Sequence, residues 1–390
     1  MRNFDVAIVG CGPAGNIAAW HLAARGVEVA LLERATLPRP KTCGGGLSRK
    51  TLEEIPYDID PVVESEIESA FVTSGGSTFL QSKERIGVTV CRDRLDSYMA
   101  RQAVEKGVTL LESCTLESFS IRRDHVRLET SRGAFSAGVL IGADGVYSGV
   151  RRALDTSCSP FFAPAIEALV YVEPARTGLI DGGCILDFDA IPHGYGWVFP
   201  KRDHYNVGLY RYRRSRGGPG MRGMLQAFIE RFPQLHSPLR VVTRGYSIPV
   251  RRAATVVDPG GVLLAGDAAG LAENVYGEGI CFAVRSGRLA AETVAATLGG
   301  SGDLSEYAHR LRPLMRELAL SRFTASLVYA GSPGMRRRLS RSGPISRRFT
   351  GLLTGDNGYA ACLIGTAACL PFAPLLPQNR EQRSPLDLQT

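Results

Sequence analysis

Residues 6–15 read Val-Ala-Ile-Val-Gly-Cys-Gly-Pro-Ala-Gly, an apolar run followed at once by the pattern Gly-x-Gly-x-x-Gly. The run predicts a buried parallel strand. A helical pattern continues to Ala24, and residues 27–32 predict a second strand that ends at Glu33, 23 residues after Gly10. Strand, glycines, helix, strand and terminal acid in this register predict a βαβ unit that binds a dinucleotide.

Each residue of this unit has a physical reason to be there. Gly10 permits a tight turn, Gly12 lets the backbone approach a pyrophosphate, and Gly15 lets helix and strand pack closely. Pro13 and Ala14 open the helix, whose free N–H groups face the phosphates. Glu33 is placed to accept hydrogen bonds from ribose hydroxyls. The predicted cofactor-binding residues here are Gly10, Gly12, Pro13, Ala14, Gly15, Glu33 and Arg34.

Two later stretches carry a carboxylate at the end of an apolar strand. Residues 139–145 read Val-Leu-Ile-Gly-Ala-Asp-Gly and contain Asp144, and residues 261–267 end in Gly-Asp at Asp267. Ligands bind at this end of a doubly wound sheet, and Asp267 suits a ribityl hydroxyl. Either acid has the alternative role of capping a helix.

These three motifs, in this order, resemble the FAD-binding set of the flavoproteins that include aromatic-ring hydroxylases. Within that group, the Cys-Gly-Gly-Gly loop at 43–46, the segment Tyr-Gly-Trp-Val-Phe-Pro at 195–200 and the stretch 266–280 resemble the geranylgeranyl reductase family. The likeness covers roughly residues 1–300. The expected fold is α/β, with a Rossmann-like FAD-binding doubly wound sheet, an inserted antiparallel substrate sheet and a mostly helical C-terminal region.

The resemblance implies further site residues. Cys43 is expected to lie near the flavin and the reacting bond, although a free cysteine is often simply buried packing. The family pattern has an arginine at Arg92 that contacts the FAD pyrophosphate; the alternative is an exposed helix-start arginine paired with Asp96. Gly44, Gly45, Gly277, Gly279 and Ile280 complete the expected cofactor site. Asn274 departs from the family, which usually carries proline there.

Alternating aromatic residues form the expected substrate slot. Tyr195, Trp197 and Phe199 share one face if they lie on a strand, and Pro200 follows them. Such a face lines a slot for an apolar chain and steadies positive charge in an alkene. The alternative from periodicity alone is ordinary sheet packing.

The resulting hypothesis is an FAD-dependent oxidoreductase that saturates isoprenoid double bonds by hydride transfer and protonation. No second dinucleotide motif is evident, so NAD(P)H or a reduced protein carrier is expected to visit as electron donor. A flavin monooxygenase acting on an aromatic or polyketide-like substrate is the first alternative. A non-catalytic escort of prenylated cargo is the second.

Bulk composition narrows the classes of protein. The 390 residues, 44% hydrophobic and 22% charged, exclude a disordered or polytopic membrane chain. Nine cysteines without paired spacing indicate reduced thiols in a cytoplasmic protein, and the six histidines show no metal-site spacing. The net charge is +8, but the sequence shows no motif that recognises nucleic acid, so no nucleic-acid partner is expected.

The expected domains are discontinuous. Residues 1–60, 90–155 and 245–297 form the FAD-binding domain, 61–89 and 156–244 the substrate domain, and 298–390 the helical region. Six arginines lie in 335–349, before a charge-free stretch at 357–379 interrupted by prolines. Three interpretations of this part of the chain are open. It is a helix packed on the domain, an interfacial segment that holds 335–379 at a membrane surface, or a spanning helix.

Overall fold

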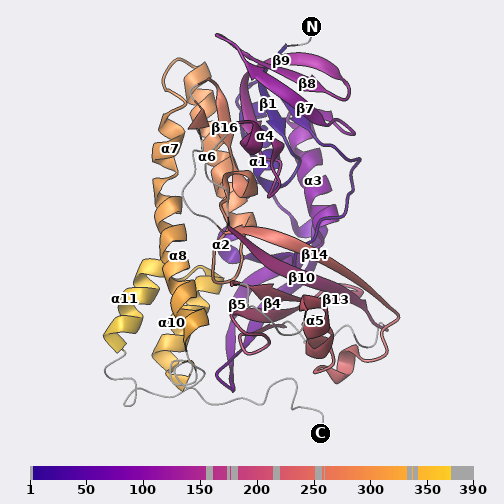
Figure 1. Ribbon diagram of the computed structural model, residues 1–390, viewed down its shortest axis with the longest axis vertical. Coiled ribbons are helices and arrows are strands. Elements are labelled where there is room, and N and C mark those ends of the chain that lie inside the picture. Colours follow the sequence, from indigo (N-terminus) through magenta and orange to yellow (C-terminus); the bar gives the residue numbers. More distant parts are fainter. Residues whose placement is uncertain are drawn as a thin grey trace.

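A computed structural model describes residues 3–154, 161–173, 176, 183–213, 220–250, 257–258, 260–331, 336 and 341–369. Two eight-stranded sheets lie one above the other in Figure 1, with long helices along one side. The first sheet lies near the N-terminus. The second lies below it, so the site expected at the strand ends of the first sheet faces the second.

The first sheet has the order β15-β16-β9-β1-β2-β6, and its central strands are parallel. Residues 6–9 of β1 and all of β2 are buried apolar runs that share one core with residues of the helices α1 (Pro13–Ala23) and α6 (Ile280–Leu298). A β7–β8 hairpin extends β9. The strands are β1 (Asn3–Val9), β2 (Val29–Leu32), β6 (Thr109–Leu111), β7 (Leu116–Ile121), β8 (Val126–Thr130), β9 (Gly133–Gly142), β15 (Val257–Asp258) and β16 (Val262–Leu264).

The predicted βαβ unit is confirmed. Helix α1 (Pro13–Ala23) starts directly after Gly12 and joins β1 to β2. Gly10 has φ +106°, and a Cβ there would lie 2.4 Å from the carbonyl oxygen of Ala143, so the turn requires glycine. Gly15 packs against Gly10, where a Cβ would strike the Gly10 carbonyl oxygen.

Helices pack on the first sheet. α1 packs against α6 (Ile280–Leu298) and α3 (Arg92–Glu105). The short helices are α2 (Arg49–Leu52), α4 (Gly149–Ala153), η1 (Asp60–Val62) and η4 (Gly266–Ala269). The helix expected to open at Arg92 and the helix expected after Gly279 are both present.

The second sheet has the order β14-β10-β13-β12-β11-β4-β5-β3. It is antiparallel except for the parallel pair β4–β11. Helix α5 (Met221–Ile229) and the 3-10 turn η3 (Pro233–Leu235) lie between β13 and β14 in the chain. The strands are β3 (Gly46–Ser48), β4 (Val63–Ser74), β5 (Ser77–Val90), β10 (Phe161–Tyr171), β11 (Gly183–Asp187), β12 (Gly194–Pro200), β13 (His204–Arg211) and β14 (Arg240–Val250).

Two segments lie in a different sheet from the expected one. β3 pairs with β5, and all of β14 pairs with β10, so residues 46–48 and 245–250 belong to the second sheet. The physical reason is pairing over long sequence distances, which local patterns do not reveal. The domain boundaries themselves remain a prediction.

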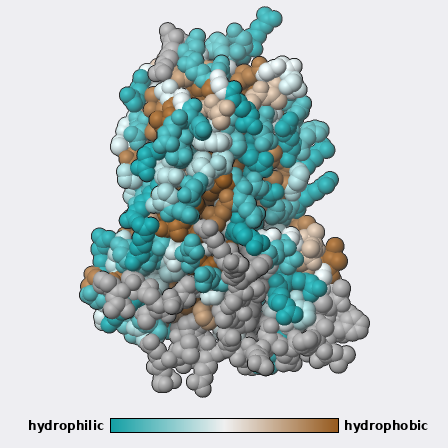
Figure 2. Space-filling model, turned by 180° about the vertical axis from the view of Figure 1, so that it is seen from behind, coloured by the Kyte–Doolittle hydropathy of each residue, from teal (hydrophilic) through white to brown (hydrophobic). Residues whose placement is uncertain are grey.

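The C-terminal region is helical where it is described, with α7 (Glu306–Arg310), α8 (Arg312–Ala330), α10 (Gly343–Thr354) and α11 (Tyr359–Cys369). α11 packs on the domain through Tyr359 and Cys362, which are buried, while Ile364 is 71% exposed. Residues 335, 337–340 and 370–379 of the arginine-rich and charge-free stretches lie outside the described residues. In the described chain, every helix is too short or too polar to cross a membrane. The face in Figure 2 is mostly hydrophilic, with hydrophobic atoms gathered near mid-height.

Candidate cofactor and substrate site

A cavity of about 580 Å³ lies where the two sheets meet. It brings together almost all of the predicted site residues, although they come from widely separated parts of the chain. The predicted residues that line it are Gly10, Gly12, Pro13, Ala14, Glu33, Arg34, Cys43, Gly44, Gly45, Arg92, Asp144, Tyr195, Trp197, Phe199, Asp267, Gly277, Gly279 and Ile280. Gly15 and Pro200 are outside the lining. Gly15 packs the helix on the turn, and the carbonyl of Pro200 accepts a hydrogen bond from the Thr89 hydroxyl.

The glycine turn fits a dinucleotide phosphate. Gly12 lines the cavity at the start of α1, and a Cβ added to it would meet no atom within 4 Å. The Gly12 backbone is therefore free of side-chain atoms at the point where the first N–H groups of α1 face the cavity. These residues, the cofactor cradle, fit the pyrophosphate of a dinucleotide.

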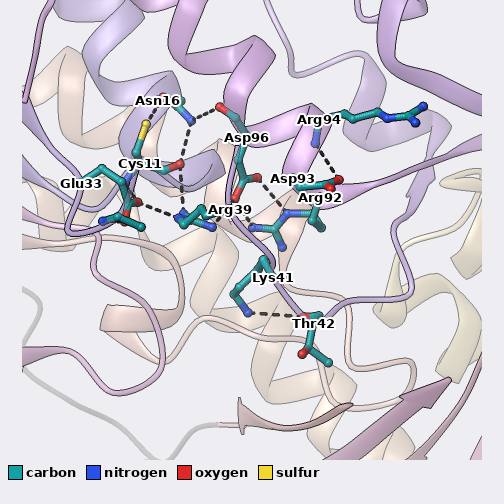
Figure 3. A network of polar contacts seen from close by, with 11 residues as sticks. Cys11, Asn16, Glu33, Arg39, Lys41, Thr42, Arg92, Asp93, Arg94 and Asp96 are labelled. Carbon is teal, nitrogen blue, oxygen red and sulfur yellow. Dashed lines mark hydrogen bonds and ion pairs between the residues drawn. The ribbon is translucent and has the colours of Figure 1, made fainter. Parts of the chain in front are cut away.

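Charged side chains joined by ion pairs form the adjoining wall of the cavity (Figure 3). Arg39 Nε lies 2.9 Å from Glu33 Oε2, and Arg39 Nη1 lies 3.1 Å from Asp96 Oδ2. Arg92 holds Asp96 with two more hydrogen bonds of 2.9 and 3.0 Å. The pairing of Arg92 with Asp96 is the one named as the alternative, but the Arg92 side chain is only 8% exposed, and the residue also lines the cavity. It thus remains placed to face an anionic ligand.

The two strand-end carboxylates differ in their contacts. Asp144 Oδ2 accepts from the backbone N–H groups of Gly149 and Val150, which begin α4, so the helix-capping alternative holds for this oxygen. Asp144 Oδ1 is buried and has no hydrogen-bond partner in the described structure. Burial raises the pKa of Asp267, and Lys41 and Arg92 oppose that shift. Asp144 Oδ1 and Asp267 are acceptors available to cofactor hydroxyls.

The Cys-Gly-Gly-Gly loop is held by side chains of the second sheet. Glu167 Oε2 accepts from the Cys43 N–H at 3.0 Å, and Asn206 Nδ2 donates to the Cys43 carbonyl at 3.3 Å. Lys201 Nζ donates to the Gly44 carbonyl at 3.0 Å and to that of Val90 at 2.8 Å. Burial lowers the pKa of Lys201 to about 8. These contacts fix Cys43 at the junction between the cofactor cradle and the aromatic strand.

The three aromatic residues of β12 do share one face. Tyr195 and Trp197 have ring centroids 5.9 Å apart, and Trp197 and Phe199 6.4 Å apart. All three line the cavity beside the glycine loop, and a Cβ on Gly44 would lie 3.0 Å from Trp197 Nε1. Their polar atoms point elsewhere: the Tyr195 hydroxyl donates to the Tyr276 carbonyl and Trp197 Nε1 to Asn206 Oδ1. The wall they present to the cavity is therefore apolar.

The loop from Leu271 to Gly279 is tied to the second sheet and to α8. The Tyr210 hydroxyl donates to the Asn274 carbonyl at 3.0 Å, and both nitrogen atoms of Asn274 donate to Ser321 Oγ. Asn274 is 3% exposed and is absent from the cavity lining. The family departure at this position therefore changes how the loop is anchored to α8 and adds no side chain to the cavity.

Several lining residues escaped the sequence-based prediction. They include Glu167 on β10, Arg39, Lys41, Tyr246 on β14 and Glu278. Glu167 left a usable signal, because it is the single charged residue in the otherwise uncharged strand Phe161–Tyr171. Such a carboxylate is costly to bury unless it is paired or functional.

The fold and the cradle define a flavoprotein of the FAD-binding class, and the FAD binding domain family matches residues 3–172. A digeranylgeranylglycerophospholipid reductase of Methanoculleus marisnigri is 31% identical over 327 residues, 79% of this chain and 80% of the relative. The chain belongs to the geranylgeranyl reductase family of FAD-dependent oxidoreductases.

Two solved structures share the fold. A geranylgeranyl bacteriochlorophyll reductase-like protein of Thermoplasma acidophilum superposes with a TM-score of 0.78 at 21% identity, covering 96% of this chain and 98% of that one. The flavin-dependent halogenase CmlS superposes with a TM-score of 0.70 at 20% identity, covering 95% and 78%. The same architecture therefore carries more than one flavin chemistry, and the site must decide between them.

Proposed function

We propose that this protein saturates the carbon–carbon double bonds of a geranylgeranyl-type isoprenoid. The observation that carries the proposal is the apolar wall of Tyr195, Trp197 and Phe199, which adjoins both the Cys43 loop and the cofactor cradle in one cavity. Relatives named as reductases of geranylgeranyl compounds support the same substrate class.

An isolated alkene requires a hydride at one carbon and a proton at the other. When bound, reduced FAD supplies the hydride. The chain's own residues orient the prenyl group: the three rings of β12 give flat apolar contact, and their faces stabilise positive charge on the alkene. Burial of this wall excludes water from the reacting bond. Cys43 lies at the point where the cradle and the wall meet, and we assign it to the reacting end of the slot.

We extend the proposal to the electron donor, the substrate and a membrane surface. NAD(P)H or a reduced protein carrier supplies electrons, and a prenylated small molecule or lipid is the substrate. The arginine-rich part of 335–379 would then meet a membrane surface when the substrate is a lipid.

The flavin monooxygenase is the second candidate, favoured by the fold shared with a halogenase. An anaerobic assay distinguishes the two functions. Purified protein with dithionite as reductant and a geranylgeranyl compound should yield product heavier by two mass units per bond reduced. A monooxygenase would give no such product, and in air it would instead consume O₂ with NAD(P)H when an aromatic substrate is added.

A further inference from the structure

Glu167 presents a carboxyl group to the cavity beside Cys43. It lies on β10, is 2% exposed and is part of the cavity lining. Its hydrogen bonds in the described part of the chain go to Oε2, from Cys43 N and from Asn206 Nδ2, both at 3.0 Å. Asn206 also accepts from Trp197, so Glu167 is fixed between the loop and the aromatic wall.

The environment of Glu167 favours its protonated form. No lysine or arginine among the described residues lies within ion-pair distance of it. The charged or titratable groups that face it are Cys43 from the loop, Lys201 after β12 and Arg244 on the neighbouring strand β14. Burial raises the pKa of Glu167, and the hydrogen bonds from Asn206 and Cys43 only partly oppose the shift. A carboxyl group whose pKa is raised keeps its proton to higher pH than an ordinary glutamate, as a general acid requires.

Cys43 is placed differently. Its sulfur accepts a hydrogen bond from the Gly45 N–H at 3.4 Å, so the sulfur acts as an acceptor within its own loop. Glu167 and Cys43 both line the cavity as neighbours, and Glu167 is the carboxyl group of the pair.

We infer that Glu167 delivers the proton that completes the reduction of the double bond, a role that rests on the proposed function. One alkene carbon gains the hydride, and the other forms a C–H bond with the proton of the Glu167 carboxyl. Glu167 is left as a carboxylate and regains a proton from solvent. The alkene gains two electrons and two hydrogens in all, and the electrons come from the reduced cofactor.

The test compares wild type with Glu167→Gln. Glutamine keeps an oxygen to accept from Cys43 N, but its amide does not donate the proton. Asp187→Asn is the matched control, because Asp187 is 1% exposed, has a pKa raised by burial and lies on β11 outside the cavity lining. Each holoenzyme is reduced anaerobically and mixed with geranylgeranyl diphosphate, and flavin reoxidation is followed against pH in H₂O and D₂O.

Glu167→Gln should slow reoxidation about 100-fold. It should also abolish the loss of rate at high pH and the solvent isotope effect, with flavin content and prenyl binding unchanged. Asp187→Asn should keep the wild-type pH profile. Should Glu167→Gln fail to fold, Glu167→Asp should be slower than wild type and retain the alkaline loss of rate.

Infrared spectroscopy gives a readout that does not depend on turnover. A protonated-carboxyl band that titrates in wild type and is missing from Glu167→Gln is expected. Its absence from wild type at pH values where the enzyme turns over would overturn the role. A Glu167→Gln rate and pH profile equal to wild type would do the same, while leaving the proposed function standing. Wild-type holoenzyme that reduces no prenyl compound would instead refute the proposed function.

Discussion

Arg39 bridges Glu33 and Asp96, with its guanidinium 2.9 Å from one carboxylate and 3.1 Å from the other. Glu33 is 4% exposed and Asp96 fully buried, so Arg39 lies between two buried carboxylates, and Arg92 supplies a second cation to Asp96. It thereby joins the end of β2 to α3 at the edge of the cofactor cradle.

Arg39→Ala should lower the free energy of unfolding by about 3 kcal/mol, because it leaves Glu33 buried without its cation. Urea denaturation of the apoprotein measures the change. Arg127→Ala removes an ion pair whose side chains are 37% and 45% exposed, and should cost less than about 1 kcal/mol. Equal losses in the two variants would show that the Arg39 bridge adds nothing to stability.

Gly12→Val should abolish FAD binding and leave the fold intact. The valine side chain would enter open space at the start of α1, where the backbone faces the cavity. The visible flavin absorbance per protein is the measurement, with circular dichroism as a check on folding. Gly223→Ala is the control, since Gly223 lies in α5 with nothing within 4 Å of an added Cβ. A Gly12→Val protein that retained full flavin would refute the cradle.

Cys43→Ala should retain FAD and lose prenyl reduction by about 100-fold, the scale of one positioned catalytic group. Product mass after anaerobic turnover is the readout. Cys281→Ala, a buried thiol in α6 outside the cavity lining, should behave as wild type. Undiminished reduction by Cys43→Ala would remove this cysteine from the reaction.

The buried Lys201 predicts a stability change at alkaline pH. Burial lowers its pKa from 10.5 to about 8. Between these values the unfolded chain holds a proton that the folded protein has released, so the free energy of unfolding rises with pH. Relative to Lys201→Met, wild type should gain about 2 kcal/mol between about pH 8 and pH 10. Urea denaturation of both proteins across this range tests it, and a difference that stays constant would contradict a neutral Lys201 in the fold.

The parts of the fold predicted from sequence are those fixed by local chemistry. β1, Gly10 and α1 follow from an apolar run, a turn that only glycine permits and a proline at the helix start. The alternation of Tyr195, Trp197 and Phe199 likewise places all three on one face of β12 without knowledge of the neighbouring strands.

The remaining site residues depend on contacts between distant segments. Cys43 and Glu167 are 124 residues apart in the sequence, and the loop before β3 brings Cys43 to Glu167 although β3 and β10 lie near opposite edges of the second sheet. The three-residue strand Gly46–Ser48 has too little pattern to reveal its partner β5. Neither pairing is encoded in local propensity, so the acid beside Cys43 emerged only from the structure.

The most direct test of prenyl reduction is a single anaerobic turnover of the fully reduced protein with geranylgeranyl diphosphate. One equivalent of flavin should reoxidise per double bond saturated, and the product should be two mass units heavier for each bond. Flavin that stays reduced with the prenyl compound, yet reoxidises rapidly in air when an aromatic substrate is present, would contradict a reductase and identify a monooxygenase.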